Sequence, residues 1–415
     1  MRLRDANGLP RVAVTGMGAV SCVGTGIAAL LDALHTRRHG LRRMDAFAAL
    51  GMRGSVGGPV DEAALPPEPP RKLRRFLPPP ALYAWHAANE ALAQAGLPAT
   101  RLAGADCGLV LGGGAALSEH EEALQNHRAR GIAKLSPFLV PRGMSSALSA
   151  GLAQAFGVGG SSYTLSSACT SSAHAIGHAM ELIQLGRQNV VIAGGAEELH
   201  PSTAMWFDAM GALSPQTEPT HALRPFHRER DGFALAAGAG VLVLESLEHA
   251  RARGARVLAE LAGYGSATDA ANMVVAGTDG IARALRQALE RAGTLPDYIN
   301  AHACGTQGDL AEWQAIAGVF AERGAAVPPL SSIKGLLGHA PSAAGALDAI
   351  ACLLMLEHDF LAAGASLDDP DPTFADAPLL AANREQRIDA ALSNSFGFGG
   401  SCAALLFRRH AEVAA

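Results

Sequence analysis

The chain contains 415 residues, and its 33 Lys and Arg residues against 38 Asp and Glu residues give a formal net charge of −5 at pH 7. Hydrophobic residues make up 49% of the sequence and charged residues 17%, so the chain can bury a large core, which excludes wholesale disorder. The mild negative charge excludes a polybasic tail that binds nucleic acid. This length fits two or three domains, or one large α/β unit of two similar halves.

No membrane span is expected, because the longest uncharged apolar stretch, residues 233–244, has 12 residues, whereas a transmembrane helix needs roughly 18 or more. The amino terminus lacks the layout of a signal peptide, so we expect a cytoplasmic protein. The six cysteines are far apart and none has metal-ligand spacing, so we expect reduced thiols and no metal site.

Hydrophobic periodicity predicts strands and helices that alternate through the first half of the chain. A strand at 11–19 precedes a helix at 27–34, and the proline-rich stretch 66–80 is expected to contain no regular element. The following elements are a helix at 81–95, a strand at 107–111, helices near 118–130 and 145–156, a strand at 162–165, a helix at 169–185 and a strand at 189–193.

The second half repeats this rhythm. Two apolar runs at 234–245 and 257–264 flank a short helix at 247–253, and we expect them to form adjacent strands. The following elements are a helix at 280–292, a strand at 298–302, helices at 311–320 and 343–356, and strands at 390–394 and 401–408. The repeated order predicts a layered α/β architecture in which both halves share one core.

The strongest local signal for chemistry is Cys169, which stands between a short strand and an apolar-periodic helix in the sequence LSSACTSSAHAIG. The start of a helix carries partial positive charge and unpaired N–H groups, which stabilise a thiolate and a developing oxyanion. A lone cysteine is usually a small core residue. Its position at this turn nevertheless favours a nucleophile.

Three further segments place polar residues next to glycines. His302 ends a predicted strand in NAHACGTQGD, and His339 follows Lys334 in SSIKGLLGH. Histidines at strand ends can donate N–H hydrogen bonds to a carbonyl or an enolate. The loop NSFGFGGS around Phe398 contains glycines that let backbone N–H groups approach a ligand, although taken alone it fits an ordinary hairpin turn equally well.

In this order, the segments resemble the β-ketoacyl synthases of the thiolase superfamily, most closely those of the synthase I group of fatty acid synthesis. The resemblance covers nearly the whole chain and includes GMGAVSCVG, FDAMGALS and RDGF as well as the segments above. It implies a thiolase-like fold, in which two similar βαβαβαββ halves form a layered αβαβα core. Residues 1–256 would form the half that carries the nucleophile, and residues 257–415 the half that carries the two histidines.

The resemblance implies an acyltransferase that condenses a malonyl group on acyl carrier protein, with loss of CO2, with an acyl group held on Cys169. His302 and His339 would hold the malonyl thioester carbonyl and stabilise the enolate that decarboxylation leaves. Lys334, paired with Glu312, would orient and polarise the histidines. The other implied roles are the oxyanion hole, formed by the backbone N–H groups of Cys169 and Phe398, and support from Asp309 and from the gating aromatics Phe233 and Phe398.

The resemblance also implies the partners. Both substrates would arrive on the phosphopantetheine arm of acyl carrier protein, so no resident cofactor is expected. A homodimer is expected, with a heterodimer with a related ketosynthase-like chain as the alternative. The acidic carrier protein would dock on a basic rim formed by Lys72, Arg75, Arg130 and Lys134.

The segment after His302 departs from the family pattern. Ala303 replaces a glycine and Cys304 adds a second thiol, and Asp309 follows His302 by seven positions instead of eight. These changes indicate an altered substrate shape, so the pathway stays open between fatty acid synthesis and polyketide or aryl polyene synthesis. Two alternatives stay open. One is a non-catalytic chain-length partner of another ketosynthase, and the other is a thiolase that acts on coenzyme A esters.

Overall fold

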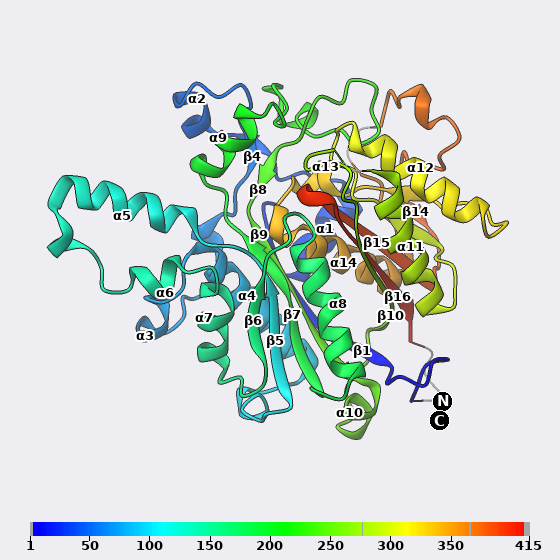
Figure 1. The fold of residues 1–415 in the computed structure, drawn as a ribbon, viewed down its shortest axis with the longest axis horizontal. Coiled ribbons are helices and arrows are strands. Elements are labelled where there is room, and N and C mark those ends of the chain that lie inside the picture. Colours follow the sequence, from blue (N-terminus) through cyan, green and yellow to red (C-terminus); the bar gives the residue numbers. More distant parts are fainter. Residues whose placement is uncertain (1–2, 276, 365–366, 411–415) are drawn as a thin grey trace.

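The computed structural model describes residues 3–275, 277–364 and 367–410 (Figure 1). A large mixed sheet runs through the body of the molecule, helices cover its faces, and one helical arm projects from the side. Within these residues, no helix is both long and apolar enough to cross a membrane.

Eleven strands form the central sheet. In chain order, the strands of the first half are β1 (Val12–Ser21), β2 (Gly24–Thr25), β5 (Cys107–Gly112), β6 (Ser162–Leu165), β7 (Val190–Glu197) and β9 (Gly238–Ser246). Those of the second half are β10 (Ala259–Thr268), β11 (Tyr298–Asn300), β12 (Leu330–Ser331), β15 (Ala390–Gly397) and β16 (Ser401–Arg409). Their order across the sheet is β12-β11-β15-β16-β10-β1-β9-β7-β5-β6, with β2 paired to β1.

The two halves of this sheet have the same topology. Outward from the centre, β1, β9, β7, β5 and β6 correspond to β10, β16, β15, β11 and β12. In each half the first two pairings are antiparallel and the outer two are parallel. Both central strands also shift register early, between Val14 and Gly16 in β1 and between Leu261 and Gly263 in β10. The predicted duplication is therefore confirmed. The two halves also share the register shift near the start of the central strand.

Glycines explain how a helix can lie directly on each central strand. A Cβ atom at Gly18 in β1 would overlap the carbonyl group of Ala87 in α4 (Pro79–Ala95). A Cβ atom at Gly265 in β10 would likewise overlap the carbonyl group of Ala284 in α11 (Thr278–Ala292). Only glycine permits this approach of backbone to backbone.

The side chains of the strands alternate between two helical layers, as expected for strands buried on both faces. In β9, Val241 and Val243 pack with α4 and α7 (Ala147–Phe156), whereas Leu242 and Leu244 pack with α8 (Ser171–Gln184) and α14 (Pro341–His358). Figure 1 shows α8 and α14 together in the middle of the molecule. In the second half α11 and α12 (Gly308–Ala321) form the other outer layer. The result is the layered αβαβα arrangement.

Two local expectations were wrong, and one helix was not predicted. The strands predicted at 234–245 and 257–264 do not pair with each other, because β9 and β10 lie on opposite sides of β1. The proline-rich stretch contains the short helix α3 (Arg71–Arg74) and the start of α4, since Pro79 occupies a first-turn position where no N–H group is needed. Helix α9 (Pro201–Ala209) was not predicted, although Pro201 also marks a helix start.

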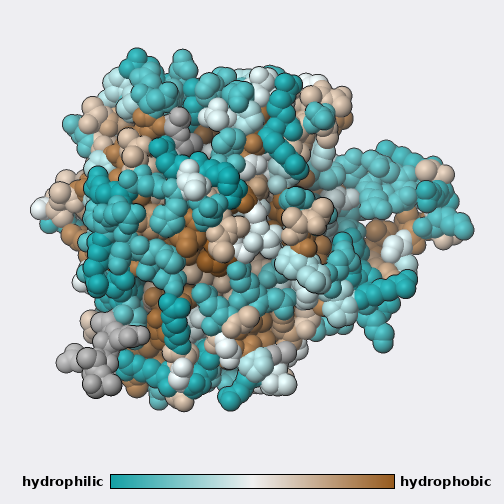
Figure 2. Space-filling view, turned by 180° about the vertical axis from the view of Figure 1, so that it is seen from behind, coloured by the Kyte–Doolittle hydropathy of each residue, from teal (hydrophilic) through white to brown (hydrophobic). Residues whose placement is uncertain are grey.

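The projecting arm consists of α5 (Leu117–Arg130), η3 (Ile132–Lys134) and α6 (Leu139–Gly143) (Figure 1). Figure 2 shows the opposite side of the molecule, where the arm is mostly hydrophilic. The remaining elements are α1 (Ile27–Thr36), β3 (Arg42–Arg43), α2 (Asp45–Ala49), β4 (Val56–Gly58), η1 (Glu62–Ala64), η2 (Ala99–Arg101), η4 (Pro219–His221), β8 (Leu235–Ala236), α10 (Leu247–Ala252), α13 (Lys334–Leu337), β13 (Phe360–Leu361), η5 (Pro372–Phe374), β14 (Arg384–Glu385) and η6 (Phe398–Gly400).

Candidate active site

Cys169 lies in the turn between β6 and α8. Helix α8 begins at Ser171, so Cys169 precedes the helix instead of opening it as predicted. The thiol is buried, with 8% of the residue exposed. It faces a cavity of about 420 Å³ that is also lined by His302, His339 and Phe398. The residues that sequence patterns singled out separately are therefore brought together in one site.

The two histidines reach this cavity from the second half of the chain. His302 follows β11 by two residues, and His339 stands between α13 and α14. The Nε2 atom of His339 lies 3.1 Å from Sγ of Cys169. The two imidazole rings are 5.4 Å apart between centroids and nearly perpendicular, at 83°. One histidine thus contacts the sulfur and the other lies beside it.

Burial sets the protonation states of this triad. It raises the pKa of Cys169 to about 12, an effect that the nearby Glu197 carboxylate increases and Lys334 opposes. Burial, together with the positive charge of Lys334, lowers the pKa of His339 to about 3 and holds that of His302 well below its usual value. Burial therefore favours neutral imidazoles. It opposes the thiolate that the dipoles at the turn would favour, because desolvation is the largest effect on this thiol.

Lys334 forms its ion pair with a residue that the sequence did not indicate. Its Nζ atom lies 2.6 Å from Oδ2 of Asp348 in α14, and both side chains are almost fully buried. The predicted pairing with Glu312 is therefore wrong. Glu312 lies in α12 and Asp348 in α14, and both carboxylates are buried. The position of α14 places Asp348 next to the Lys334 ammonium group.

Glu312 instead supports the backbone of the histidine loop. Its carboxylate accepts hydrogen bonds from the N–H groups of His302 and Ala303, both at 2.9 Å, and from Nδ2 of Asn394 at 3.0 Å. Burial raises the pKa of this carboxyl group to about 7, against the effect of these donors. Glu312 thus ties α12 to both the His302 loop and β15.

Asp309 organises the remainder of the same loop. Its carboxylate accepts backbone N–H groups from Cys304, Gly305 and Thr306, at 3.1–3.2 Å. A fourth N–H group, from Phe226 of a separate segment, donates at 3.1 Å. The loop after His302 is one residue shorter than in the family pattern, yet its backbone N–H groups still donate to Asp309.

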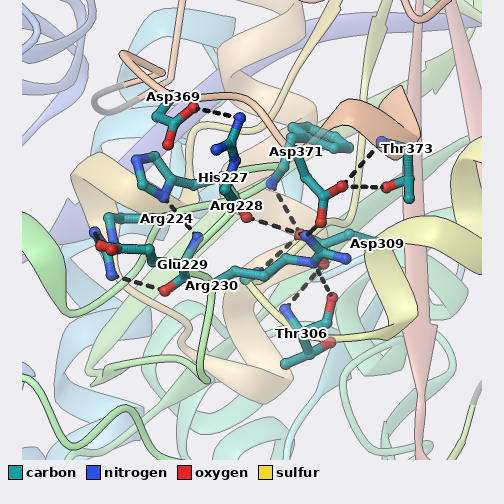
Figure 3. A network of polar contacts seen from close by, with 12 residues as sticks. Arg224, His227, Arg228, Glu229, Arg230, Thr306, Asp309, Asp369, Asp371 and Thr373 are labelled. Carbon is teal, nitrogen blue, oxygen red and sulfur yellow. Dashed lines mark hydrogen bonds and ion pairs between the residues drawn. The ribbon is translucent and has the colours of Figure 1, made fainter. Parts of the chain in front are cut away.

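Figure 3 shows how the segment before Phe233 is fastened to this loop. Arg230 donates from Nε to the carbonyl oxygen of Thr306 at 3.2 Å, and from Nη1 to Oδ2 of Asp371 at 2.6 Å. Nδ1 of His227 accepts the N–H group of Glu229 at 3.0 Å. These contacts hold one wall of the cavity, because Arg230 lines it beside Phe233.

Aromatic rings cover the histidines. The ring of Phe233 lies 5.3 Å from that of His339, and Phe207 lies 5.6 Å from Phe233 and 6.1 Å from Phe398. Phe207 is the first residue of the segment FDAMGALS, and the sequence indicated no individual role for it. It connects the two predicted gating aromatics.

Two comparisons with known proteins identify the family of this chain. The N-terminal domain family of the β-ketoacyl synthases matches residues 10–250, and the C-terminal domain family matches residues 258–368. The chain belongs to the β-ketoacyl synthase family. It is 39% identical to 3-oxoacyl-[acyl-carrier-protein] synthase 1 of Haemophilus influenzae, over 96% of this chain and 99% of that one. It is 38% identical to the same enzyme of Escherichia coli, over 97% and 99%.

Solved structures agree with this assignment. The β-ketoacyl synthase of Burkholderia phymatum has a TM-score of 0.88 and 34% identity, over 97% of this chain and all of that one. The ishigamide ketosynthase/chain length factor gives a TM-score of 0.87 and 32% identity over the same shares. A type II polyketide ketosynthase in complex with its acyl carrier protein gives 0.86 and 29%, again over the same shares. The thiolase-like fold and an acyltransferase of the ketosynthase class are therefore confirmed.

The second thiol of the synthase, Cys304, also lines the cavity. Its side chain is partly buried, and its Sγ atom lies 3.8 Å from Oγ1 of Thr306. Burial and the neighbouring Asp309 carboxylate raise the pKa of this thiol far above its usual value. Cys304 is therefore an uncharged part of the cavity wall.

The four basic residues proposed for carrier docking are exposed on two parts of the synthase. Lys72 lies in α3, and the guanidinium of Arg75 stacks 5.1 Å from the ring centroid of Phe76 and 5.0 Å from that of Phe138 in the arm. Arg130 and Lys134 lie farther along the arm, at the end of α5 and in η3.

Among the residues described, no cluster of three or more His, Cys, Asp and Glu could hold a metal ion.

Proposed function

We propose that this synthase holds an acyl group on Cys169 and condenses it with a malonyl group whose decarboxylation is assisted by His302 and His339. The observation that carries the proposal is the contact of 3.1 Å between Sγ of Cys169 and Nε2 of His339, with the ring of His302 beside it in the same cavity. A nucleophile and two neutral proton donors or acceptors thus share one small space.

In the acylation step, the thiol loses its proton as the new bond forms. Burial keeps Cys169 protonated and His339 neutral at rest. When Sγ attacks the thioester carbonyl of the acyl carrier, its proton passes to Nε2 of His339 and then to the departing pantetheine sulfur. One thioester forms and one breaks. The backbone N–H groups of Cys169 and Phe398 would stabilise the negative oxygen in between.

In the second step, the malonyl thioester carbonyl would accept hydrogen bonds from Nε2 of His302 and of His339. Because Nε2 of His339 accepts a proton in the first step and donates in the second, its ring proton would move from Nδ1 to Nε2 once Cys169 is acylated. Loss of CO2 leaves an enolate, whose negative oxygen these two donors stabilise in a site that excludes water. The enolate carbon attacks the acyl group on Cys169, the carbon–sulfur bond breaks, and the sulfur takes up one proton. The low pKa values of both histidines favour this role, because a neutral imidazole keeps its donor without adding charge.

Two buried charged side chains, Lys334 and Glu312, would support these steps, and two aromatic rings would control access to the site. Lys334 adds positive charge that lowers the pKa of both histidines, and its pairing with Asp348 fixes its position. Glu312 would hold the His302 loop through two backbone N–H groups. Phe233 and Phe398 would act as gates, since both line the cavity and both contact Phe207.

The partner of the synthase would be an acyl carrier protein that docks on Lys72, Arg75, Arg130 and Lys134 and delivers both substrates on its phosphopantetheine arm, with no resident cofactor. A ketosynthase of similar fold is found in complex with its acyl carrier protein, which supports the docking proposal. We further propose a homodimer. Strand β6 ends the central sheet and pairs on one side only within the described chain, which leaves an edge for a second copy.

The substrate is proposed to differ in shape from that of fatty acid synthesis. Ala303 and Cys304 line the cavity beside His302, where their side chains would narrow the space left for substrate. Relatives of the chain include both 3-oxoacyl-[acyl-carrier-protein] synthases and a putative polyketide β-ketoacyl synthase of Streptomyces cyaneus. A polyketide or aryl polyene intermediate is the proposed acyl group.

One experiment separates the proposal from its alternatives. Purified protein is incubated with malonyl carrier protein and a mixed pool of acyl carrier proteins, and separately with coenzyme A esters alone. Cys169→Ser is run in parallel, and CO2, products and protein adducts are measured. Condensation and an acyl adduct at Cys169, both lost in the variant, support the proposal. Inactivity of both proteins would instead indicate a non-catalytic chain-length partner. Turnover of coenzyme A esters without CO2 release would indicate a thiolase.

A further inference from the structure

The turn that carries Cys169 has a backbone conformation that must be held in place. Ala168 adopts φ of 53°, one of four positive values among the described non-glycine residues. An alanine in this left-handed region is strained, and such strain persists only where the surrounding contacts fix the chain. A displacement of this turn would change the contact between Sγ of Cys169 and Nε2 of His339.

Contacts from the first turn of α8 hold this turn locally. Oγ of Ser171 accepts the N–H group of Ser167 at 2.9 Å and donates to the carbonyl oxygen of Ala168 at 2.6 Å. Oγ1 of Thr170 donates to the carbonyl oxygen of Ser167 at 2.5 Å, and also lies 2.8 Å from Oγ of Ser401. The contact between Thr170 and Ser401 reaches β16. The other contacts stay within residues 167–171, so they do not fix the position of this segment in the fold.

His174, one turn farther along α8, connects this segment to the central sheet. Its Nδ1 atom lies 2.8 Å from Oγ of Ser167. Its Nε2 atom lies 3.4 Å from the carbonyl oxygen of Cys402 in β16 and 3.2 Å from Oγ of Ser266 in β10. The ring also packs edge-on against Tyr264, 6.4 Å between centroids. One side chain thus joins the nucleophile turn to two strands of the other half.

These partners fix the tautomer of the ring. A carbonyl oxygen only accepts, so Nε2 carries the proton that faces Cys402. Nδ1 must then accept, and the hydroxyl of Ser167 donates to it. Burial lowers the pKa of His174, in keeping with a neutral ring.

We infer that His174 is a positioning residue for the condensation reaction: its imidazole bridges Ser167 to β10 and β16 and so holds Cys169 in reach of His339. The inference rests on the proposed role of Cys169 as the nucleophile. His174 lies behind the turn and does not line the cavity, so it would act on the acylation of Cys169 and leave the release of CO2 to the other two histidines.

Two substitutions break one end of the bridge each. In His174→Gln, the amide nitrogen can replace Nε2 and donate to Cys402, but no acceptor faces Ser167. In His174→Asn, the amide oxygen can replace Nδ1 and accept from Ser167, but the side chain is too short for β16. His178→Gln is the matched control, since His178 lies one turn on in α8 with 44% of its side chain exposed. Ser167→Ala and the double variant with His174→Gln complete the set.

The rate of Cys169 acylation is measured by mass spectrometry in single turnovers, and the rate of CO2 release is measured on enzyme that is already acylated. Loss of one hydrogen bond slows acylation about fivefold to tenfold. We expect this loss in both His174 variants and in Ser167→Ala, no further loss in the double variant, and unchanged acylation in His178→Gln. CO2 release and the melting temperature should change little.

The inference is overturned if either His174 variant acylates at the normal rate, if the double variant shows additive losses, or if acylation and CO2 release fall together with the melting temperature. Should His174→Gln fail to fold, His174→Asn and Ser167→Ala still decide the question. Cys169→Ser, run in parallel, separates the two proposals. Acylation that persists in Cys169→Ser would show that the nucleophile is misassigned, whatever His174 does.

Discussion

Lys334 and Asp348 form an ion pair that is 2.6 Å long and almost completely removed from solvent. The ammonium group carries the positive charge that helps keep His302 and His339 neutral. Asp348 is therefore the carboxylate that partners the lysine beside the two imidazoles in a buried site.

Removal of Asp348 should be costly for stability. In Asp348→Ala the Lys334 ammonium would be buried without its partner, which costs about 3–5 kcal/mol of unfolding free energy. Urea unfolding followed by circular dichroism measures this loss. Glu68→Gln is a matched control, because Glu68 pairs with Arg74 at the surface and is 70% exposed, so its removal should cost less than about 1 kcal/mol. Equal losses in the two variants would contradict the prediction.

The two histidines should differ in the first step of the reaction. Both His302→Ala and His339→Ala should lower CO2 release by roughly 100-fold or more, because each removes a donor to the enolate. Acylation should be slowed only in His339→Ala, since only His339 contacts Sγ of Cys169. Single-turnover acylation assays and CO2 release on the same preparations test this. Normal CO2 release in either variant would remove the proposed role of that histidine.

The reactivity of Cys169 should keep rising with pH. Because burial raises the pKa of this thiol to about 12, its thiolate fraction increases about tenfold per pH unit between about pH 7 and pH 10. The rate constant for alkylation by iodoacetamide should follow the same slope, and Cys169→Ser should abolish it. A plateau near neutral pH would mean that the thiolate already predominates there.

Glu312 should make stability depend on pH in the weakly acidic range. Its pKa is raised from 4.5 to about 7 in the folded protein, so the unfolded chain loses this proton first. The contribution of Glu312 to the free energy of unfolding is then largest below pH 4.5 and falls by about 3 kcal/mol as the pH rises to about 7. In Glu312→Gln this dependence disappears. The stability difference between wild type and variant, measured at about pH 4 and about pH 8, must change by this amount if the prediction holds.

Charge reversal on the docking rim should weaken carrier binding alone. The double variant Lys72→Glu and Arg75→Glu should raise KM for acyl carrier substrates about tenfold, with kcat unchanged, because it places negative charge before an acidic partner. The effect should shrink at high salt. Arg187→Glu, an exposed site after the far end of α8, is the control for a charge reversal away from the rim. An unchanged KM in the double variant would remove Lys72 and Arg75 from the interface.

The sequence by itself determined which residues meet in the site. Cys169, His302 and His339 stand at strand ends and helix starts, and in a duplicated layered fold these positions converge at one edge of the sheet. Strand and helix positions followed from local periodicity, which depends on neighbours in the chain. The acidic residue after the shortened loop also kept its role, because three of the N–H groups that Asp309 accepts belong to the adjacent residues 304–306.

Tertiary structure alone decided the quantities that depend on packing between distant segments. The partner of Lys334 is Asp348 and not Glu312, because α14 brings its carboxylate to the ammonium while Glu312 is taken up by backbone N–H groups. Cys169 is a thiol at rest, since the depth of its burial cannot be read from its place before a helix. The order β10-β1-β9 likewise arises from the joining of two halves, which no local pattern encodes.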